Sequence, residues 1–283
     1  MIDDAAAISG DIVLRAAKRG VSAGELIGLV LSRALVREEL GDSSAVAWFL
    51  LDDYAEWLGQ REEGIADILG LSVGTASDGT IRLRAVVTEA KYVDAGGLAE
   101  ATRKSRNQLR QTVERMDDAL FGDPGRLDRD LWLSRIADLL LDGTAALGQA
   151  SLLERVRDGI RRGSVPIDLR GYSHIFISGP AIDGSALGEQ EPIAEIASGL
   201  QEIFSREGLR QLIKAYEAGT PLGGLRGALG QDHVWGKENF RDPAPRVDWT
   251  KAIAAEPKSP QPTPVIADLD QEDDDDEDNV SLD

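Results

Sequence analysis

Three residues in the first third of the chain have the types and spacing that hydrolysis of a phosphodiester requires. Glu89 and Lys91 stand two apart in the run IRLRAVVTEAKYV, and Asp67 lies in the preceding run IADILGLS. Alternate residues of a strand share a face, so Glu89 and Lys91 should point to the same side of a sheet. Two carboxylates can hold Mg²⁺ or Mn²⁺ against a phosphate, and a neighbouring amine can orient the attacking water. We therefore interpret Asp67, Glu89 and Lys91 as a candidate catalytic set, with the two carboxylates as metal ligands.

Two apolar runs separated by a turn signal must position these residues. Ser77-Asp78-Gly79 is a tight-turn sequence, and the run after it begins with alternating apolar and basic residues. We therefore predict strands over 65–72 and 81–93 that pair as an antiparallel hairpin, and a further strand over 45–51. The hairpin would place the two carboxylates on neighbouring strands, with Asp67 near the middle of the first.

Helical periodicity accounts for most of the remaining chain, apart from one late apolar strand. Helices are predicted over 10–18, 22–40, 96–120, 128–141, 151–162, 191–204 and 206–218, and the late strand over 172–178. This order predicts an α/β fold with a mixed sheet flanked by helices. We divide the chain into a main domain at 1–185, a helical appendage for partner docking at 186–245, and a disordered Pro-containing linker with an acidic tail at 246–283.

The composition excludes several kinds of site and limits others. The chain contains no cysteine, which rules out disulfides, thiolate metal sites and cysteine nucleophiles and fits a reducing cytoplasm. The N-terminus shows no long apolar run, so we expect neither a secretory signal nor a membrane span. The net charge is -19, and residues 268–283 hold ten acidic residues and no basic one. Because the rest of the chain stays acidic, nucleic acid would need a local basic patch or a partner.

The spacing of the candidate set resembles a known nuclease motif. Asp67, twenty-one further residues and then Glu89-Ala90-Lys91 resemble the PD-(D/E)xK superfamily, although alanine replaces the usual proline at position 66. The resemblance implies a restriction-endonuclease-like fold and magnesium-dependent cleavage of DNA. It also implies a glutamate ligand on the helix before the sheet, for which Glu38 or Glu39 is available. RecB-type members keep a glutamine on the helix after the motif, and Gln108 is similarly placed.

The helix predicted over 96–120 carries the strongest local basic patch. Lys104, Arg106 and Arg110 lie on it beside the candidate set, where they would contact phosphates. The phrases FLLDDYAEWLG, IADILGL and VVTEAKYV, over about 22–180, resemble nuclease segments of bacterial restriction and antiphage systems. Such segments accompany HerA-type or phosphorothioation-dependent ATPases. Because this chain lacks GxxxxGK[ST], the resemblance implies a separate ATPase subunit as partner, besides DNA.

Other interpretations of the same features stay open. Glu89 and Lys91 could form only a surface ion pair, or the fold could be a catalytically silent scaffold that docks an ATPase. Gly70 to Gly74 match the G-x-S-x-G elbow of serine hydrolases, but a turn follows where that motif needs a helix. His174 lies in an apolar strand and is interpreted as a core residue. The acidic tail is either a solvated extension or a mimic of DNA.

Overall fold

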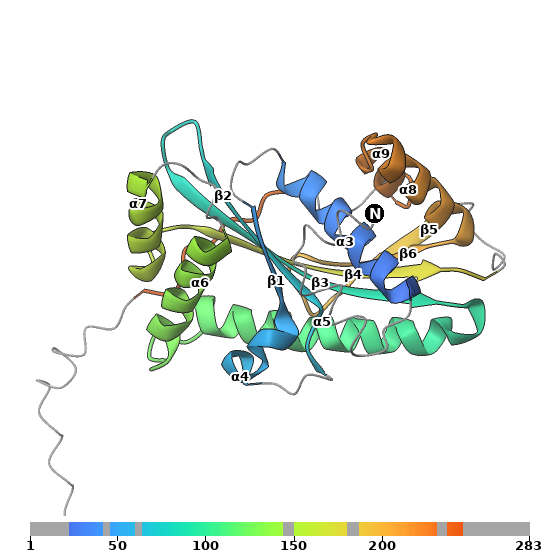
Figure 1. The fold of residues 1–283 in the computed structure, drawn as a ribbon. Coiled ribbons are helices and arrows are strands. Elements are labelled where there is room, and N and C mark those ends of the chain that lie inside the picture. The colour runs from blue at the N-terminus through green and yellow to red at the C-terminus, as the bar shows by residue number, and fades with distance from the viewer. Residues whose placement is uncertain are drawn as a thin grey trace, which may run out of the picture. The chain divides into compact units, whose positions relative to one another are not determined.

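A six-stranded mixed sheet forms the centre of the protein (Figure 1). This computed structural model describes residues 23–41, 46–59, 64–143, 150–179, 187–230 and 237–245. The sheet order is β1-β2-β3-β4-β6-β5. The strands are β1 (Val46–Leu50), β2 (Ile68–Thr75), β3 (Ile81–Val93), β4 (Ile167–Ile177), β5 (Gly188–Pro192) and β6 (Gly199–Phe204). The first three pair antiparallel, β4 is parallel to β3 and β6, and β5 is antiparallel to β6. The predicted mixed sheet is confirmed.

Helices cover both faces of this sheet. They are α3 (Ala23–Leu40), α4 (Ala55–Leu58), α5 (Leu98–Phe121), α6 (Arg129–Gly143), α7 (Ala150–Arg161), α8 (Arg206–Ala218) and α9 (Gly223–Gly227), with short 3-10 turns η1 (Leu51–Tyr54) and η3 (Ala95–Gly97). Leu109 of α5 and Ile136 of α6 share one buried cluster with Val87 of β3. Leu35 of α3 and Leu212 of α8 lie in another. Figure 1 shows α5 running along one side of the sheet, with α3, α8 and α9 on the other.

The predicted β-hairpin is confirmed, with a shift in its first strand. Ile68 pairs with Thr88 and Thr75 with Ile81, and Gly79 takes a positive φ of 81° in the turn between them. β2 starts three residues later than predicted, so Asp67 immediately precedes the strand instead of lying in its middle. This position matters because a residue at a strand end is less constrained by the ladder and can present its carboxylate beside β3.

The helix predicted over 191–204 was wrong, because this segment forms the last two residues of β5 and all of β6. Ile193 and Ile196 repeat at helical spacing, but they fill a buried turn between the two strands. Gly199 permits that turn, since a Cβ there would lie only 2.5 Å from the Cβ of Ile196. Pairing of β6 with β4 and β5 therefore overrides the local periodicity. Part of the segment predicted as a helical appendage belongs to the sheet.

Several predictions concern residues outside the described ranges. These are the helix over 10–18, the first residue of the helix over 22–40, and the linker and tail from 246 onward. No helix among the described residues is both long and apolar enough to cross a membrane. The helix predicted over 206–218 is confirmed as α8, and α5 and α6 lie within two residues of their predicted bounds.

Candidate active site

Asp67 is fixed by hydrogen bonds at its backbone and at its side chain. Its amide donates to the Thr88 carbonyl over 3.0 Å, and its carbonyl accepts from the Leu51 amide over 3.0 Å. Its Oδ2 accepts from the Ala90 amide over 2.8 Å. These bonds tie Asp67 to β3 between Thr88 and Ala90, directly opposite Glu89. The sequence prediction that Asp67 and Glu89 come together is borne out by this geometry.

Glu89 is a fully buried carboxylate whose negative charge has few neutralising or hydrogen-bonding partners. Among the described residues, its Oε1 pairs with the Nζ of Lys91, and no backbone amide donates a hydrogen bond to either of its oxygens. The side chain of Lys91 is 24% exposed. The ion pair that we considered as a surface alternative therefore exists, but one partner lies inside the protein. A buried carboxylate that is compensated by a single amine, with a second carboxylate nearby, is costly to keep ionised.

Electrostatics couple these three groups to one another. Burial raises the pKa of Asp67, and the positive charge of Lys91 and the Ala90 amide offset this only in part. Burial and the charge of Asp67 raise the pKa of Glu89 well above its usual range. Burial alone would lower the pKa of Lys91, but the charges of Glu89 and Asp67 outweigh it and raise that pKa. The amine therefore stays protonated at neutral pH, while the carboxyl pair readily retains a proton.

Two further acidic residues act on this site and were not included in the sequence-based set. The charge of Asp52 raises the pKa values of both Asp67 and Glu89. Asp52 follows β1 in η1, and the bond from the Leu51 amide to Asp67 brings the two segments together. The charge of Glu25, in the first turn of α3, raises the pKa of Lys91. Asp52 could have been noticed as a carboxylate directly after the strand that neighbours Asp67.

The carboxylates fit a hard divalent cation that keeps much of its water shell. Within the described part of the chain, no three acidic, histidine or cysteine side chains are grouped so that they could hold one metal ion. Mg²⁺ and Mn²⁺ suit oxygen ligands, and Mg²⁺ is often held by only one or two carboxylates. The buried carboxylate of Glu89, whose partner among the described residues is Lys91, could supply an oxygen ligand for such a cation. Zinc would require a fuller nitrogen or sulfur set.

Gln108 lies near the site but contacts the backbone that precedes Asp67. Its Nε2 donates to the Ile65 carbonyl over 3.3 Å. One turn later, the hydroxyl of Thr112 accepts from the Ala66 amide over 3.0 Å. α5 therefore holds the two residues that lead into Asp67. This geometry gives Gln108 a positioning role, whereas we predicted a catalytic one, and Thr112 shares that role.

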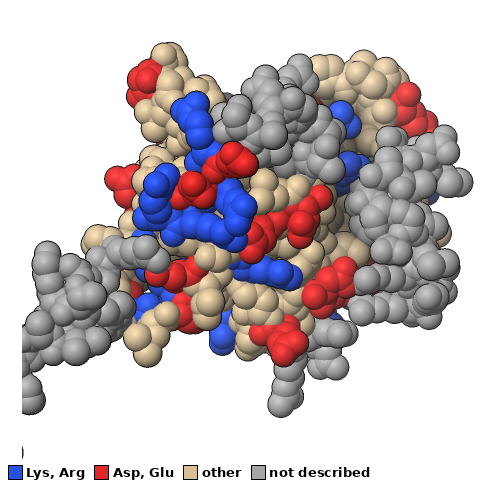
Figure 2. Space-filling model, turned by 60° about the vertical axis from the view of Figure 1, so that its left-hand side comes forward, with Lys and Arg blue, Asp and Glu red and all other residues tan. Residues whose placement is uncertain are grey.

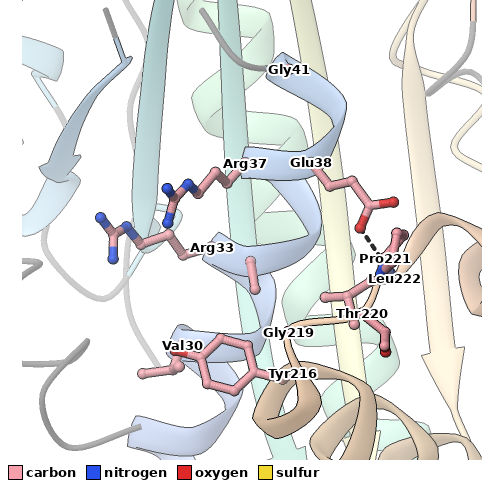
Figure 3. Close-up of a pocket in the computed structure, with 11 residues that line it drawn as sticks. Val30, Arg33, Arg37, Glu38, Gly41, Tyr216, Gly219, Thr220, Pro221 and Leu222 are labelled. Atoms are coloured by element: carbon pink, nitrogen blue, oxygen red, sulfur yellow. Dashed lines mark hydrogen bonds between the residues drawn. The ribbon is translucent and has the colours of Figure 1, made fainter. Parts of the chain in front are cut away.

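The structure does not bring Glu38 to the candidate site. Its carboxylate accepts hydrogen bonds from the amides of Leu222 and Gly223, and Figure 3 shows it pointing toward that loop while Arg33 and Arg37 point the other way. These residues line a pocket of about 600 Å³ between α3 and the segment after α8. The α3 carboxylate whose charge acts on Lys91 is Glu25, at the opposite end of the helix.

Glu39 is also directed away from the site. The hydroxyl of Tyr172 donates to its Oε1 over 2.8 Å, and Arg226 donates to its Oε2 over 3.0 Å. Tyr172 pairs with Thr88, so it points to the sheet face opposite to that of Glu89. The prediction that Glu38 or Glu39 completes the metal site is therefore not supported, because α3 presents these residues to α9 and β4.

The three basic residues predicted to bind nucleic acid differ in their surroundings. Arg106 contacts Gln201 and Glu191, at 2.9 and 2.6 Å. Arg110 pairs with Glu114 one turn along the same helix, at 3.0 Å. Lys104 is exposed at the surface of α5. All three lie on the helix that covers the candidate site, and Arg106 alone of them reaches across to neighbouring strands.

A second polar cluster lies on the α3 face and has a structural character. His174 contacts the Ser32 hydroxyl and the Glu202 carboxylate, both at 3.0 Å, and Arg226 donates to Glu202 at 2.8 Å. Burial alone would raise the pKa of Glu202, but Arg226 and His174 lower it to about 2. Ser32, His174 and Glu202 are fully buried, so a substrate cannot reach them. The interpretation of His174 as a core residue is confirmed.

The serine hydrolase alternative is not supported by the fold. Ser72 lies inside β2, pairs with Arg84 of β3, and is 1% exposed. β2 continues to Thr75 and enters a hairpin turn, so the strand-to-helix elbow that would expose a nucleophile is missing there. In comparisons with known proteins, no family model matches the chain, and no curated protein or solved structure matches it either.

Proposed function

We propose that this chain is a metal-dependent nuclease whose active site consists of Asp67, Glu89 and Lys91. The observation that carries the proposal is the buried Glu89 carboxylate, which lies opposite Asp67 and whose partner among the described residues is the amine of Lys91. Burying two neighbouring carboxylates opposes folding, so they would not be expected in a strand with a purely structural role. A bound cation would compensate this unfavourable free energy, and a phosphate would then complete the site.

The element order supports a restriction-endonuclease-like core. The chain order includes one helix (α3), an antiparallel set of three strands (β1–β3), a long helix (α5) and a parallel fourth strand (β4), with α4 between β1 and β2 and with α6 and α7 between α5 and β4. In the nuclease superfamily that the motif resembles, the acidic residues and the lysine lie on the second and third strands of such a meander. This fold is compatible with the proposal, but a fold does not determine an activity, and the proposed nuclease chemistry depends on the site residues.

Each residue has a distinct task in the proposed reaction. Asp67 and Glu89 would hold the divalent cation, which supplies Lewis acidity toward a phosphate oxygen when it is bound. Lys91 stays protonated, so it would orient the attacking water and offset negative charge that develops on the phosphate, and it would not act as a base. Gln108 and Thr112 hold the backbone before Asp67 and so keep the carboxylates in register.

The proposal is tested by cleavage of nucleic acid by the full-length protein with Mg²⁺ or Mn²⁺. We expect wild type to nick plasmid DNA or degrade oligonucleotides, and Asp67→Asn and Lys91→Met to lose at least about 100-fold in rate, as for loss of a group that stabilises the transition state. Circular dichroism should show an unchanged fold. Glu207→Gln, on the exposed surface of α8, is the control that matches the charge change of Asp67→Asn, and Arg210→Met, its exposed partner, matches that of Lys91→Met. Wild-type cleavage that persists in both site variants would refute this assignment.

We further propose that the nuclease belongs to a bacterial restriction or antiphage system and acts with a separate HerA-type ATPase on DNA. This second proposal depends on the resemblance of the segments FLLDDYAEWLG, IADILGL and VVTEAKYV, which contain Asp52 and the candidate set, to nuclease segments of such systems. The assay should therefore be repeated with any ATPase encoded beside the gene. A stable complex with that ATPase, without cleavage by wild type under either condition, would favour the catalytically silent scaffold.

A further inference from the structure

A row of polar side chains crosses the sheet from the candidate metal site toward the far edge. Glu89 of β3 pairs with Ser173 of β4, Ser173 with Gln201 of β6, and Gln201 with Glu191 of β5. Residues that pair directly across strands share a face, so all four lie on the side that α5 covers. Glu89, Ser173 and Gln201 are fully buried, whereas the Glu191 side chain is 66% exposed. The row therefore links the buried carboxylate to the surface.

Arg106 of α5 lies over the outer half of this row. Its Nη2 donates to Oε1 of Gln201 over 2.9 Å and to Oε2 of Glu191 over 2.6 Å. Its Nε is buried and has no hydrogen-bond acceptor among the described residues. The preceding residue, Ser105, contacts the Ser173 hydroxyl at 2.7 Å, which fixes this turn of the helix against β4. Arg106 is thus a guanidinium positioned by Gln201, with its Nη2 also paired to a largely exposed carboxylate.

The distance from Arg106 to the metal site suits a nucleic-acid backbone. Gln201 lies two strands from Glu89, which is about 10 Å at the usual strand spacing. Along the axis of a duplex strand this distance covers about three nucleotide steps. A strand whose scissile phosphate is at Glu89 would therefore bring a flanking phosphate within reach of Arg106.

We propose that Arg106 binds a substrate phosphate flanking the scissile one, and that Glu191 occupies this place when nucleic acid is absent. The inference rests on the proposed nuclease function and names a substrate subsite for it. Carboxylate and phosphate oxygens both match the donor fork of a guanidinium, so one can replace the other. Glu191 comes from the edge strand β5 and is mostly exposed, so it can release Arg106 without disturbing the core.

Arg110, one turn further along α5, lacks this arrangement. The partner of Arg110 is Glu114 on the same helix, and neither residue contacts the polar row through a described hydrogen bond. Such a pair is an ordinary stabilising contact of a helix surface. Arg106 differs because its acidic partner is on another element, at the end of a row that begins at Glu89.

The test measures binding of a fluorescein-labelled duplex by full-length protein, with EDTA present so that no cleavage occurs. We expect Arg106→Ala to weaken binding at least about tenfold and to lower the slope of log K against log salt by about 0.9, which corresponds to one phosphate contact. Arg106→Lys should retain part of the affinity. Glu191→Gln should tighten binding about three- to tenfold, and it should have no effect when combined with Arg106→Ala.

Glu195→Gln is the matched control for Glu191→Gln. Glu195 is also exposed, lies four residues away, and forms no ion pair with the described residues, so its substitution changes the net charge equally. A Glu191→Gln effect no larger than that of Glu195→Gln, together with wild-type binding by Arg106→Ala, would overturn the subsite and leave the nuclease proposal intact. Failure of wild type both to bind and to cleave nucleic acid would overturn both proposals.

Discussion

At the scale of single residues, Glu89 stands out as a group whose burial opposes folding. Its partner among the described residues is Lys91, and Asp67 adds a like charge nearby. We predict that, at a pH high enough to ionise this carboxyl, Glu89→Gln raises the unfolding free energy of the metal-free protein by about 1–3 kcal/mol, because a neutral amide of the same shape removes a poorly compensated charge. Urea unfolding in EDTA measures this difference.

The same variant should lose its response to metal. Mn²⁺ should raise the melting temperature of wild type, because a ligand that binds only the folded state stabilises it, and should leave Glu89→Gln unchanged. Glu207→Gln should behave like wild type in both measurements. A Glu89→Gln protein that is less stable than wild type in EDTA would show that the carboxylate is structural and would remove the main argument for a metal site.

The raised pKa of Glu89 also predicts how pH acts on metal binding. A carboxyl whose pKa is raised in the folded state holds its proton more tightly there than in the unfolded state. Its contribution to stability is therefore present at low pH and lost as pH rises above the usual value of 4.5 through the raised pKa. Metal must displace that proton, so the affinity for Mn²⁺ should increase with pH over this window. Calorimetry in two buffers of different ionisation enthalpy should detect proton release, and equal heats would contradict the prediction.

At the scale of secondary-structure elements, the sequence predicted those elements whose formation depends on neighbouring residues. The turn at Asp78-Gly79 and the alternation after it indicated the hairpin, and the apolar stripe of α5 indicated that helix. β6 was missed because it is an almost wholly buried strand between β4 and β5, and the sequence around Gly199 does not reveal this pairing.

The candidate site was predictable to a similar degree. Asp67, Glu89 and Lys91 lie on the hairpin, so their meeting followed from short-range pairing. The α3 carboxylate was misassigned to Glu38 or Glu39, because the packing of α3 on the sheet determines which end of the helix approaches Lys91. Gly24 packs so closely on Tyr92 that an added Cβ would lie 2.3 Å from its ring, and this contact places the first turn of α3, with Glu25, beside the end of β3. Such tertiary packing leaves no local signal.

α9 provides a prediction at the same scale. The helix has five residues, too few to be stable alone, and Arg226 joins it to the buried carboxylates Glu202 and Glu39. Arg226→Met would remove one cationic partner from each of two buried carboxylates, while Glu39 keeps Arg170 and Glu202 keeps His174, and we expect a loss of about 3–5 kcal/mol in unfolding free energy. Arg210→Met breaks only an exposed pair with Glu207 and should cost less than about 1 kcal/mol. Equal effects in urea unfolding would show that the buried network does not anchor α9.

At the scale of the whole molecule, charge limits how nucleic acid can be held. Figure 2 shows basic side chains gathered on one face with acidic ones between them, so that face presents no continuous positive surface. Arg82 and Arg84 illustrate this mixture, since both form ion pairs with Glu238. With a net charge of -19, long-range attraction of phosphates should be poor. Binding would then depend on local contacts such as Arg106, or on a partner subunit.

The acidic segment at 268–283 contributes more than half of that negative charge and can be deleted or neutralised by mutation. It lies outside the described residues. Deleting it removes ten acidic residues and changes the net charge from -19 to -9. We predict that the truncated protein binds labelled duplex DNA more tightly at about 0.01–0.05 M salt, and that the gain in affinity fades near physiological ionic strength, where the screening length falls to about 8 Å.

The control is a full-length variant in which the acidic residues of this segment are replaced by Asn and Gln, and it should show the same gain in affinity. If truncation tightens binding but the neutralised segment does not, steric cover and not charge is responsible. Unchanged affinity of both at low salt would reject competition with phosphate and leave the segment as a solvated extension.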